Sequence, residues 1–261
     1  MENQVRIQEI RSFWEAHPLC AGSIPYPLGT KEYFEYYDRL REANENLGFS
    51  NDLHEYQRFS KKKVLDVGSG NGYVLGKYAE HGAEVYGVDI TQISIELCRR
   101  RFEYMGAHGQ FCVANVEALP FESDTFDCVC SMGVLHHTPN IKKAIGEIFR
   151  VLHPGGRLII MIYHRNSALY RFKFPLMRMV TGKSLQQLVN EVDGFGNPKG
   201  GVFSRPEMKT LLSDFKDLKV FVGALQTWMV FPRYLRLISD RWLRRLEKYW
   251  GWFLYVKGVK P

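Results

Sequence analysis

The stretch VLDVGSGNG, residues 64–72, passes from an apolar, β-branched segment into three alternating glycines. The apolar part is typical of a buried strand, and residues 73–80 after it are typical of a helix. Glycines in such a turn tolerate positive φ and let a ligand approach the backbone, while free amides at a helix start favour a negatively charged group. The stretch therefore predicts a strand, a ligand-binding turn and a helix in succession.

Short apolar strands alternate with helices on the carboxyl side of this turn. Helices are expected at 73–80, 93–105 and 141–152. The segments expected as strands are 64–67, EVYGVDI (84–90), QFCVANV (110–116), TFDCVCSM (125–132), GRLIIMIYH (156–164), 218–222 and 253–257. This rhythm predicts an α/β fold with a doubly wound, mostly parallel seven-stranded sheet. In such sheets the ligand binds beyond the carboxyl ends of the strands.

An acidic residue after the second expected strand strengthens the prediction of a ligand site. Asp89 ends the second expected strand, 21 residues after Gly68, where a carboxylate can accept hydrogen bonds from both hydroxyls of a ribose. The glycine spacing is G-x-G-x-G, and Tyr73 stands where a dinucleotide fingerprint has glycine or alanine. The spacing therefore argues against a nicotinamide dehydrogenase, while the pair of features favours a ligand that contains a nucleoside.

With these features, residues 61–164 resemble a class I S-adenosylmethionine-dependent methyltransferase, and most resemble the branch of quinone-biosynthesis and small-molecule methyltransferases. Four motifs carry the resemblance in order: VLDVGSGNG (64–72), VYGVDI (85–90), ANVEALPFESDTFDCVCSMGVLHH (114–137) and VLHPGGRLIIM (151–161). The resemblance implies a Rossmann-like methyltransferase fold, with S-adenosyl-L-methionine as the cofactor.

The resemblance also implies which side chains bind this cofactor. The expected residues are Asp66, Gly68, Ser69, Gly70, Asp89, Ile90, Asn115, Val116 and Ser131. Those of the glycine turn would hold the methionine end, Asp89 the ribose, Ile90 the face of the adenine, and Asn115 with the Val116 amide its edge. The family usually has aspartate where this chain has Asn115, but an amide oxygen can still accept from an amine.

Candidate bases are histidines near the strand ends. Methyl transfer from a sulfonium is an in-line displacement, so a base is needed only if the acceptor carries its proton at neutral pH. His164 follows the fifth strand, and His136 and His137 follow the fourth; we expect His164 and His137 as catalytic candidates. The alternatives are loop structure or cofactor packing for the doublet and a strand-end polar residue for His164.

No metal is expected from the sequence. The five cysteines are odd in number and lack C-x-x-C spacing, which indicates neither a disulfide framework nor a zinc site. Cys128 and Cys130 alternate along an expected strand and are interpreted as small buried apolar residues.

The segments outside the core are too long for simple connections. We expect an N-terminal helical arm or lid at 1–60, a cofactor-binding core at 61–164, a lid insertion at 165–204, and the remainder of the core at 205–261, interrupted by an amphipathic helical insertion at 224–250. The arm and the insertions are rich in aromatic residues and methionine. If some of these side chains line the pocket, the acceptor is largely apolar.

Positive charge is concentrated near the C-terminus. The net charge is −4 over residues 1–60, 0 over 61–164 and +11 over 165–261. From Phe231, apolar residues recur at 231, 235, 238, 242, 246 and 249, with basic residues between them. Three interpretations remain open for this helix at 231–250: a cap over the sheet, peripheral attachment to an anionic membrane, and recognition of an acidic substrate or RNA.

These observations favour an enzyme that methylates a small, largely apolar or aromatic metabolite of secondary metabolism, on oxygen or carbon rather than nitrogen. A nucleic-acid methyltransferase is the alternative, favoured by the basic C-terminal part. Against it, Ser131-Met132-Gly133-Val134 lacks a D/N-P-P-aromatic signature. A non-catalytic binding protein of the same fold is a further alternative. The longest apolar run, 158–163, is far short of a membrane span, so a soluble, cytoplasmic protein is expected. The oligomeric state stays open.

Overall fold

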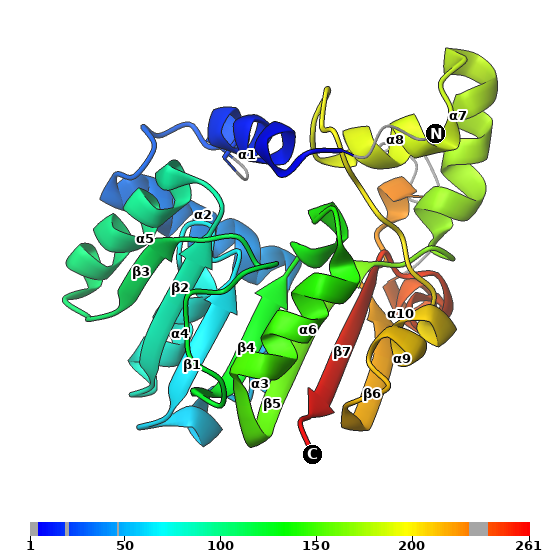
Figure 1. Cartoon of the computed structure of the whole chain (residues 1–261). Coiled ribbons are helices and arrows are strands. Elements are labelled where there is room, and N and C mark those ends of the chain that lie inside the picture. The colour runs from blue at the N-terminus through cyan, green and yellow to red at the C-terminus, as the bar shows by residue number, and fades with distance from the viewer. Residues whose placement is uncertain (1–4, 19–20, 46, 230–239) are drawn as a thin grey trace.

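A computed structural model describes the chain except for residues 1–4, 19–20, 46 and 230–239. A seven-stranded sheet of order β3-β2-β1-β4-β5-β7-β6 forms its centre (Figure 1). The strands are β1 (Lys63–Val67), β2 (Glu84–Asp89), β3 (Gln110–Val113), β4 (Phe126–Met132), β5 (Leu152–Tyr163), β6 (Lys216–Gly223) and β7 (Phe253–Val259). The first five are parallel, and β7 lies antiparallel between β5 and β6. The predicted mostly parallel sheet is thereby confirmed.

Helices cover both faces of this sheet. They are α1 (Ile7–Ala16), α2 (Lys31–Asn44), α3 (Leu47–His54), α4 (Tyr73–Glu80), α5 (Gln92–Met105), α6 (Ile141–Val151), α7 (Phe174–Thr181), α8 (Leu185–Asn190), α9 (Arg205–Leu211) and α10 (Asp240–Trp250). One apolar cluster joins the sheet to α6 and α9, and a second joins its other face to α2, α3, α4 and α5. The connections are therefore doubly wound.

Strand residues alternate between these two clusters. On β1, Val64 belongs to the cluster beneath α4 and α5, whereas Leu65 belongs to the cluster beneath α6. This period of two explains why the parallel strands read as continuous apolar runs, since both of their faces are covered. Cys128 and Cys130 on β4 are fully buried, and the described cysteines are free. Their interpretation as buried apolar residues fits this environment.

The first helix of the N-terminal arm, α1, lies over the carboxyl ends of the strands, whereas α2 and α3 pack on one face of the sheet (Figure 1). Glu15 of α1 accepts hydrogen bonds from the backbone amides of Gln92 and Ile93 at 2.9 and 3.0 Å. A carboxylate thereby caps the positive N-terminal end of α5. The buried Arg101 of α5 makes two 2.9 Å bonds to Asp38 of α2. One ion pair and one carboxylate cap thus fix the arm to α5, beside the glycine turn.

The two C-terminal insertions pack on each other. Their common apolar cluster contains residues from α7, α8 and α10 together with Tyr163, at the end of β5. The predicted helix at 231–250 is described only as α10, because residues 230–239 lie outside the described part. Among the described helices, none combines the length and the apolar character that a membrane crossing requires.

Candidate functional site

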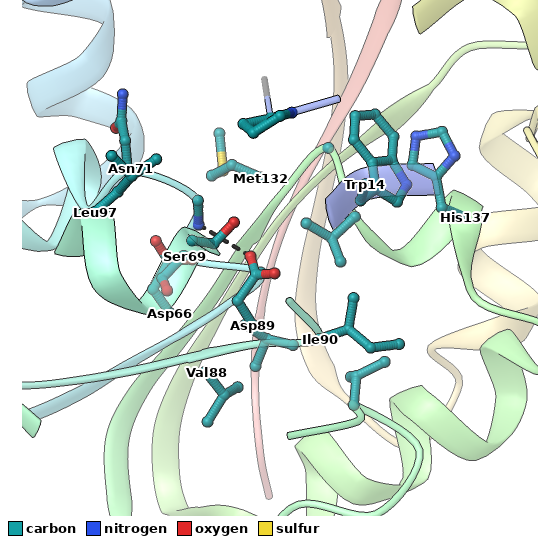
Figure 2. A pocket seen from close by; sticks show the side chains of 18 of the residues that line it. Trp14, Asp66, Ser69, Asn71, Val88, Asp89, Ile90, Leu97, Met132 and His137 are labelled. Atoms are coloured by element: carbon teal, nitrogen blue, oxygen red, sulfur yellow. Dashed lines mark hydrogen bonds between the residues drawn. The ribbon is translucent and has the colours of Figure 1, made fainter. Parts of the chain in front are cut away.

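A cavity opens at the carboxyl ends of β1, β2, β3 and β4, beneath the arm (Figure 2). The glycine turn forms its floor, and α1 and α2 supply its cover. Eight residues predicted to bind the cofactor line it: Asp66, Gly68, Ser69, Gly70, Asp89, Ile90, Asn115 and Val116. The structure therefore gathers at one place residues that span 50 positions of the sequence, from 66 to 116.

The glycine turn fits closely against its neighbours. Gly68 has φ +80°, and a Cβ atom there would come within 2.1 Å of the Val134 side chain. The Gly68 and Ser69 amides both donate to the Val88 carbonyl, at 2.7 and 3.0 Å. Only glycine combines this φ with this contact, so the turn is held in one shape by the strand beside it and by the loop after β4.

Asp89 is oriented by three hydrogen bonds. Its Oδ2 accepts from the Gly70 amide at 3.1 Å, and its Oδ1 accepts from the amide and the hydroxyl of Thr91 at 3.0 and 2.8 Å. Burial raises the pKa of Asp89, and these donors oppose the rise. The carboxylate is thus fixed at the cavity wall (Figure 2), where lone pairs left free on its oxygens can accept further bonds.

Asp66 is a buried carboxyl group whose charge is poorly stabilised by its surroundings. Its side chain is only 2% exposed, and its Oδ1 has no hydrogen-bond partner among the described residues. Burial raises its pKa to about 7, and the charge of Asp89 adds to the rise. A cationic group in the cavity would stabilise this buried carboxylate and satisfy its oxygen.

The opposite end of the cavity is largely apolar. Ile90 and Val116 line it, and Asn115 lies with them, its Oδ1 accepting from the Glu117 amide at 3.0 Å. The oxygen expected to meet the adenine edge therefore already holds a local turn, although it keeps a second lone pair. Ser131 is placed elsewhere: it is fully buried, and its hydroxyl donates to the Val67 carbonyl at 3.0 Å, so it stitches β4 to β1. Its neighbour Met132 lines the cavity instead.

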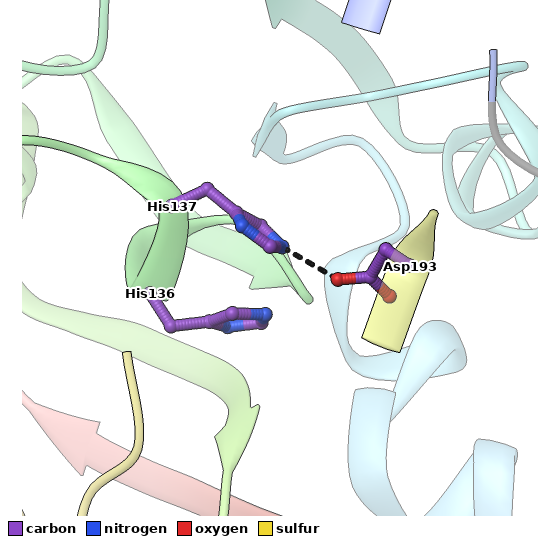
Figure 3. Close-up of side chains that lie close together, drawn as sticks. All are labelled: His136, His137 and Asp193. Carbon is purple, nitrogen blue, oxygen red and sulfur yellow. Dashed lines mark ion pairs between the residues drawn. The ribbon is translucent and has the colours of Figure 1, made fainter. Parts of the chain in front are cut away.

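The histidines expected as bases lie in two different environments. His164 is buried outside the cavity lining, with Nδ1 3.0 Å from the Gly251 carbonyl, and burial lowers its pKa. His137 lines the cavity, with Nδ1 2.5 Å from the Lys199 carbonyl and Nε2 3.3 Å from Asp193 Oδ2 (Figure 3). Both nitrogens of His137 face acceptors, so neither predicted base directs a free lone pair into the cavity.

His136 is the more buried member of the doublet. It is 1% exposed, and neither ring nitrogen has a hydrogen-bond partner among the described residues. Its ring lies 3.9 Å from that of Tyr163 and 4.1 Å from that of His137, centroid to centroid. Burial holds the pKa of His136 well below its usual value, and His137 adds to this effect.

The arm supplies the part of the lining that sequence motifs did not reveal. The arm residues at the cavity are Ile7, Ile10, Trp14, Pro18, Tyr33, Tyr37 and Arg41. The apolar positions of α1 recur at helical spacing, which could have indicated a buried face but not its target. Within the described chain, no residue after Thr138 lines this cavity. The cover of this cavity is therefore formed by the arm, while the insertion at 165–204 contacts His137 through Lys199 and Asp193.

Comparisons with known proteins agree with this geometry. Residues 65–160 match the family model described as a methyltransferase domain. The demethylmenaquinone methyltransferase of Thermus thermophilus is 34% identical over 134 residues, which are 48% of this chain and 60% of that protein. A ubiquinone/menaquinone biosynthesis C-methyltransferase of Cronobacter sakazakii is 33% identical over 109 residues, which are 40% of this chain and 43% of that protein.

The fold is shared more widely than the sequence. A Haemonchus contortus phosphoethanolamine N-methyltransferase 2, solved in complex with S-adenosyl-L-methionine, superposes with a TM-score of 0.64 at 17% identity. The match covers 100% of this chain and 61% of that one. A likeness at this identity concerns the fold alone. The chain spans 60% and 43% of the lengths of the two curated relatives above.

The buried carboxyl of Asp66 leads to a prediction about stability and pH. A raised carboxyl pKa favours the folded state only while the group is protonated, so this contribution is present below pH 3.8 and is lost as pH rises toward about 7. Asp66→Asn removes the loss. We expect the variant without ligand to be more stable than wild type at pH 8, by on the order of 1–4 kcal/mol, and the gap to narrow toward pH 5. Urea unfolding measures it.

The exposed Asp214 provides the matched control, since Asp214→Asn should leave stability unchanged relative to wild type over the same pH range. A gap for Asp66→Asn that is constant between pH 5 and pH 8 would show that burial does not hold the proton on this carboxyl.

Proposed function

We propose that this chain, whose core is a class I S-adenosylmethionine-dependent methyltransferase domain, transfers the methyl group of S-adenosyl-L-methionine to a small, largely apolar or aromatic metabolite. The observation that carries the proposal is the pairing, in one cavity, of the buried Asp66 and the half-buried Asp89 with an apolar and aromatic cover. The carboxylates suit a cationic nucleoside, and the cover suits an acceptor that water does not solvate well.

The residues present fit this cofactor. Asp66 offers an unpartnered carboxylate oxygen to an ammonium group, and the turn at 68–70 offers backbone amides to a carboxylate. Asp89 would accept from the ribose hydroxyls, and Ile90 with Val116 would pack on the adenine. When bound, the cofactor supplies an activated methyl group, so the protein has to position the acceptor in line with it and exclude water.

The arm would meet the acceptor. Trp14, Tyr33 and Tyr37 bring aromatic rings to the cavity, and Met132 faces them from the end of β4. A phenol, a hydroquinone or a similar ring fits such a lining and offers an oxygen or a carbon for methylation. The two relatives described above, a demethylmenaquinone methyltransferase and a ubiquinone/menaquinone biosynthesis C-methyltransferase, support the same class of acceptor.

The RNA alternative finds less support. The net charge of +11 lies in residues 165–261, yet no described residue from that segment lines the cavity. The cover comes instead from the arm, residues 1–60, whose net charge is −4. Phosphate groups approaching the cavity across this arm would be repelled, whereas an uncharged metabolite would not.

The basic C-terminal part suits a membrane surface. Trp242 and Tyr249 of α10 are 55% and 58% exposed, and the exposed Arg244, Arg245 and Lys248 lie among them. The ring of Trp250 contacts that of Phe172, centroids 5.3 Å apart, which continues the exposed apolar surface toward α7. We propose that this surface, the α7–α10 face, contacts an anionic bilayer and brings the enzyme to an apolar acceptor.

Transfer of the methyl group is tested directly. The protein is incubated with S-adenosyl-L-methionine labelled in its methyl group, against a panel of alkylated phenols and hydroquinones and, separately, total RNA. We expect label in at least one apolar aromatic acceptor, located on oxygen or carbon by mass spectrometry, and none in RNA. Label in RNA alone would replace the proposal with its alternative, and cofactor binding without label anywhere would indicate a binding protein.

The ribose assignment is tested with Asp89→Ala. Losing a charge-assisted acceptor should weaken S-adenosyl-L-methionine by about 1.5–3 kcal/mol, roughly 10- to 150-fold in Kd. Calorimetric titration measures the change, with the remote exposed Asp214→Ala as control. Equal affinities in Asp89→Ala and wild type would remove this carboxylate from the cofactor site.

Membrane contact is tested by sedimentation with vesicles. We expect binding to vesicles containing phosphatidylglycerol, weaker binding to phosphatidylcholine alone, and loss of binding at high salt. Trp242→Ala combined with Arg245→Glu should reduce binding several-fold while leaving cofactor affinity unchanged. Equal binding of this variant and wild type would rule out the α7–α10 face.

A further inference from the structure

Two adjacent histidines and an aspartate that is distant from them in sequence converge at the cavity wall. His136 and His137 lie in the turn η3 (Leu135–His137), and Asp193 ends the short turn η5 (Glu191–Asp193) of the insertion. Each offers one ligand atom, and these atoms lie within 4.8 Å of one another (Figure 3). All three side chains are shielded from solvent, the two histidines at 1% and 5% exposure. A cluster of two imidazoles and one carboxylate is thus enclosed in the protein.

The hydrogen bonds of His137 determine what lies between it and Asp193. A backbone carbonyl only accepts, so Nδ1 facing the Lys199 oxygen at 2.5 Å must carry a proton. Neutral imidazole then has its lone pair on Nε2, which lies 3.3 Å from Asp193 Oδ2 without forming a hydrogen bond to it. Two electron-rich atoms this close repel each other, so a positive charge near both, either a proton or a bound cation, would stabilise the arrangement.

His136 and Asp193 favour the cation. A second proton on His137 would satisfy its contact with Asp193. It would not change His136, whose two ring nitrogens have no hydrogen-bond partner among the described residues. Asp193 Oδ2 is also without a hydrogen bond, whereas its Oδ1 accepts from the Tyr163 hydroxyl. One ion would satisfy a nitrogen of His136, Nε2 of His137 and Oδ2 of Asp193 together.

Neighbouring residues hold the three candidate ligand side chains in place through hydrogen bonds and ring contacts. Lys199 fixes the tautomer of one imidazole, and Tyr163 holds the far oxygen of the carboxylate. Such partners orient metal ligands and raise their basicity. The ring of Tyr163 also packs against that of His136 at a tilt of 37°, with centroids 3.9 Å apart, which restrains the His136 ring.

We propose that His136, His137 and Asp193 bind one divalent first-row transition metal ion, such as Zn²⁺ or Fe²⁺. Two imidazoles and a carboxylate are the donor set these ions prefer, with further positions left open for water or a ligand. Ligands sharing an ion at about 2.1 Å lie roughly 3–4 Å apart, so binding requires the widest separation in the cluster, up to 4.8 Å, to close by about 1–2 Å. The cysteine-based expectation of no metal did not consider this set.

The position of the site suggests its use. His137 is both a member of the cluster and a residue of the cavity lining, so the ion would lie at the wall of the cavity, on the side of Trp14. Resting on the proposed function, an open position of this ion would bind an acceptor oxygen and favour its ionised form. The ion would then act in place of the base that neither His137 nor His164 provides in this geometry.

The site is tested with metal alone. Full-length protein is dialysed against chelator and titrated with Co²⁺ and Zn²⁺ by visible spectroscopy and calorimetry, without cofactor. We expect one equivalent to bind, with d–d absorption from Co²⁺ that Zn²⁺ displaces. His136→Gln and Asp193→Asn should each weaken binding at least about 10-fold, whereas the exposed His108→Gln should not.

Folding and cofactor binding are monitored separately. Neither His136 nor Asp193 lines the cofactor cavity, so both variants should keep wild-type affinity for S-adenosyl-L-methionine, which confirms that they are folded. Less than one equivalent of metal in wild type, or equal metal affinity in wild type and both variants, would overturn the site. Wild type that binds metal but no S-adenosyl-L-methionine would overturn the proposed function and leave the metal site intact.

Discussion

Two carboxyl groups at the ends of adjacent parallel strands, the buried Asp66 and the half-buried Asp89, constrain the rest of the structure. Asp66 on β1 and Asp89 at the end of β2 both have raised pKa values because burial disfavours their charge, and each carboxylate makes the other's surroundings more negative. Hydrogen bonds from two backbone amides and a hydroxyl offset the cost of burying the charge of Asp89. Asp66 has no such set of donors, and its Oδ1 has no hydrogen-bond partner among the described residues. The fold thus holds a site that is unfavourable until a cation enters, as expected where binding energy is concentrated.

The glycine turn holds the backbone in place beside these two carboxyl groups. Its amide at Gly70 reaches Asp89, and its neighbours at 68 and 69 are tied to the Val88 carbonyl, so the turn cannot relax away from the acids. The absence of a side chain at Gly68 also lets Val134 close over the turn. Because Arg101 donates to the Asn71 carbonyl while pairing with Asp38, the same turn is connected to the arm that covers it.

Much of this was predictable from the sequence, for physical reasons. Apolar runs of strand length separated by amphipathic helices specify a parallel sheet, and parallel strands bring their carboxyl ends to one edge, so Asp66, Asp89 and Asn115 had to meet. Ser131 illustrates the limit: along β4 successive side chains alternate in direction, and knowing that the strand ends near the cavity does not tell which residue faces it. The arm was identified as a separate segment, but its anchors on α5 depend on long-range ion pairs that no local pattern contains.

The histidine cluster could not be predicted from the sequence for the same reason. It also shows where the insertion contacts the cavity wall. Asp193 lies 56 residues after His137, in a short turn without any motif of its own. The insertion nevertheless acts on the cavity through η3, because the Gly201 amide donates to the His136 carbonyl and the Lys199 carbonyl meets the His137 ring. Val134, which packs on Gly68, directly precedes this turn. Hydrogen bonds and packing through η3 therefore connect the insertion to the glycine turn, although no residue of 165–204 is among those that line the cavity.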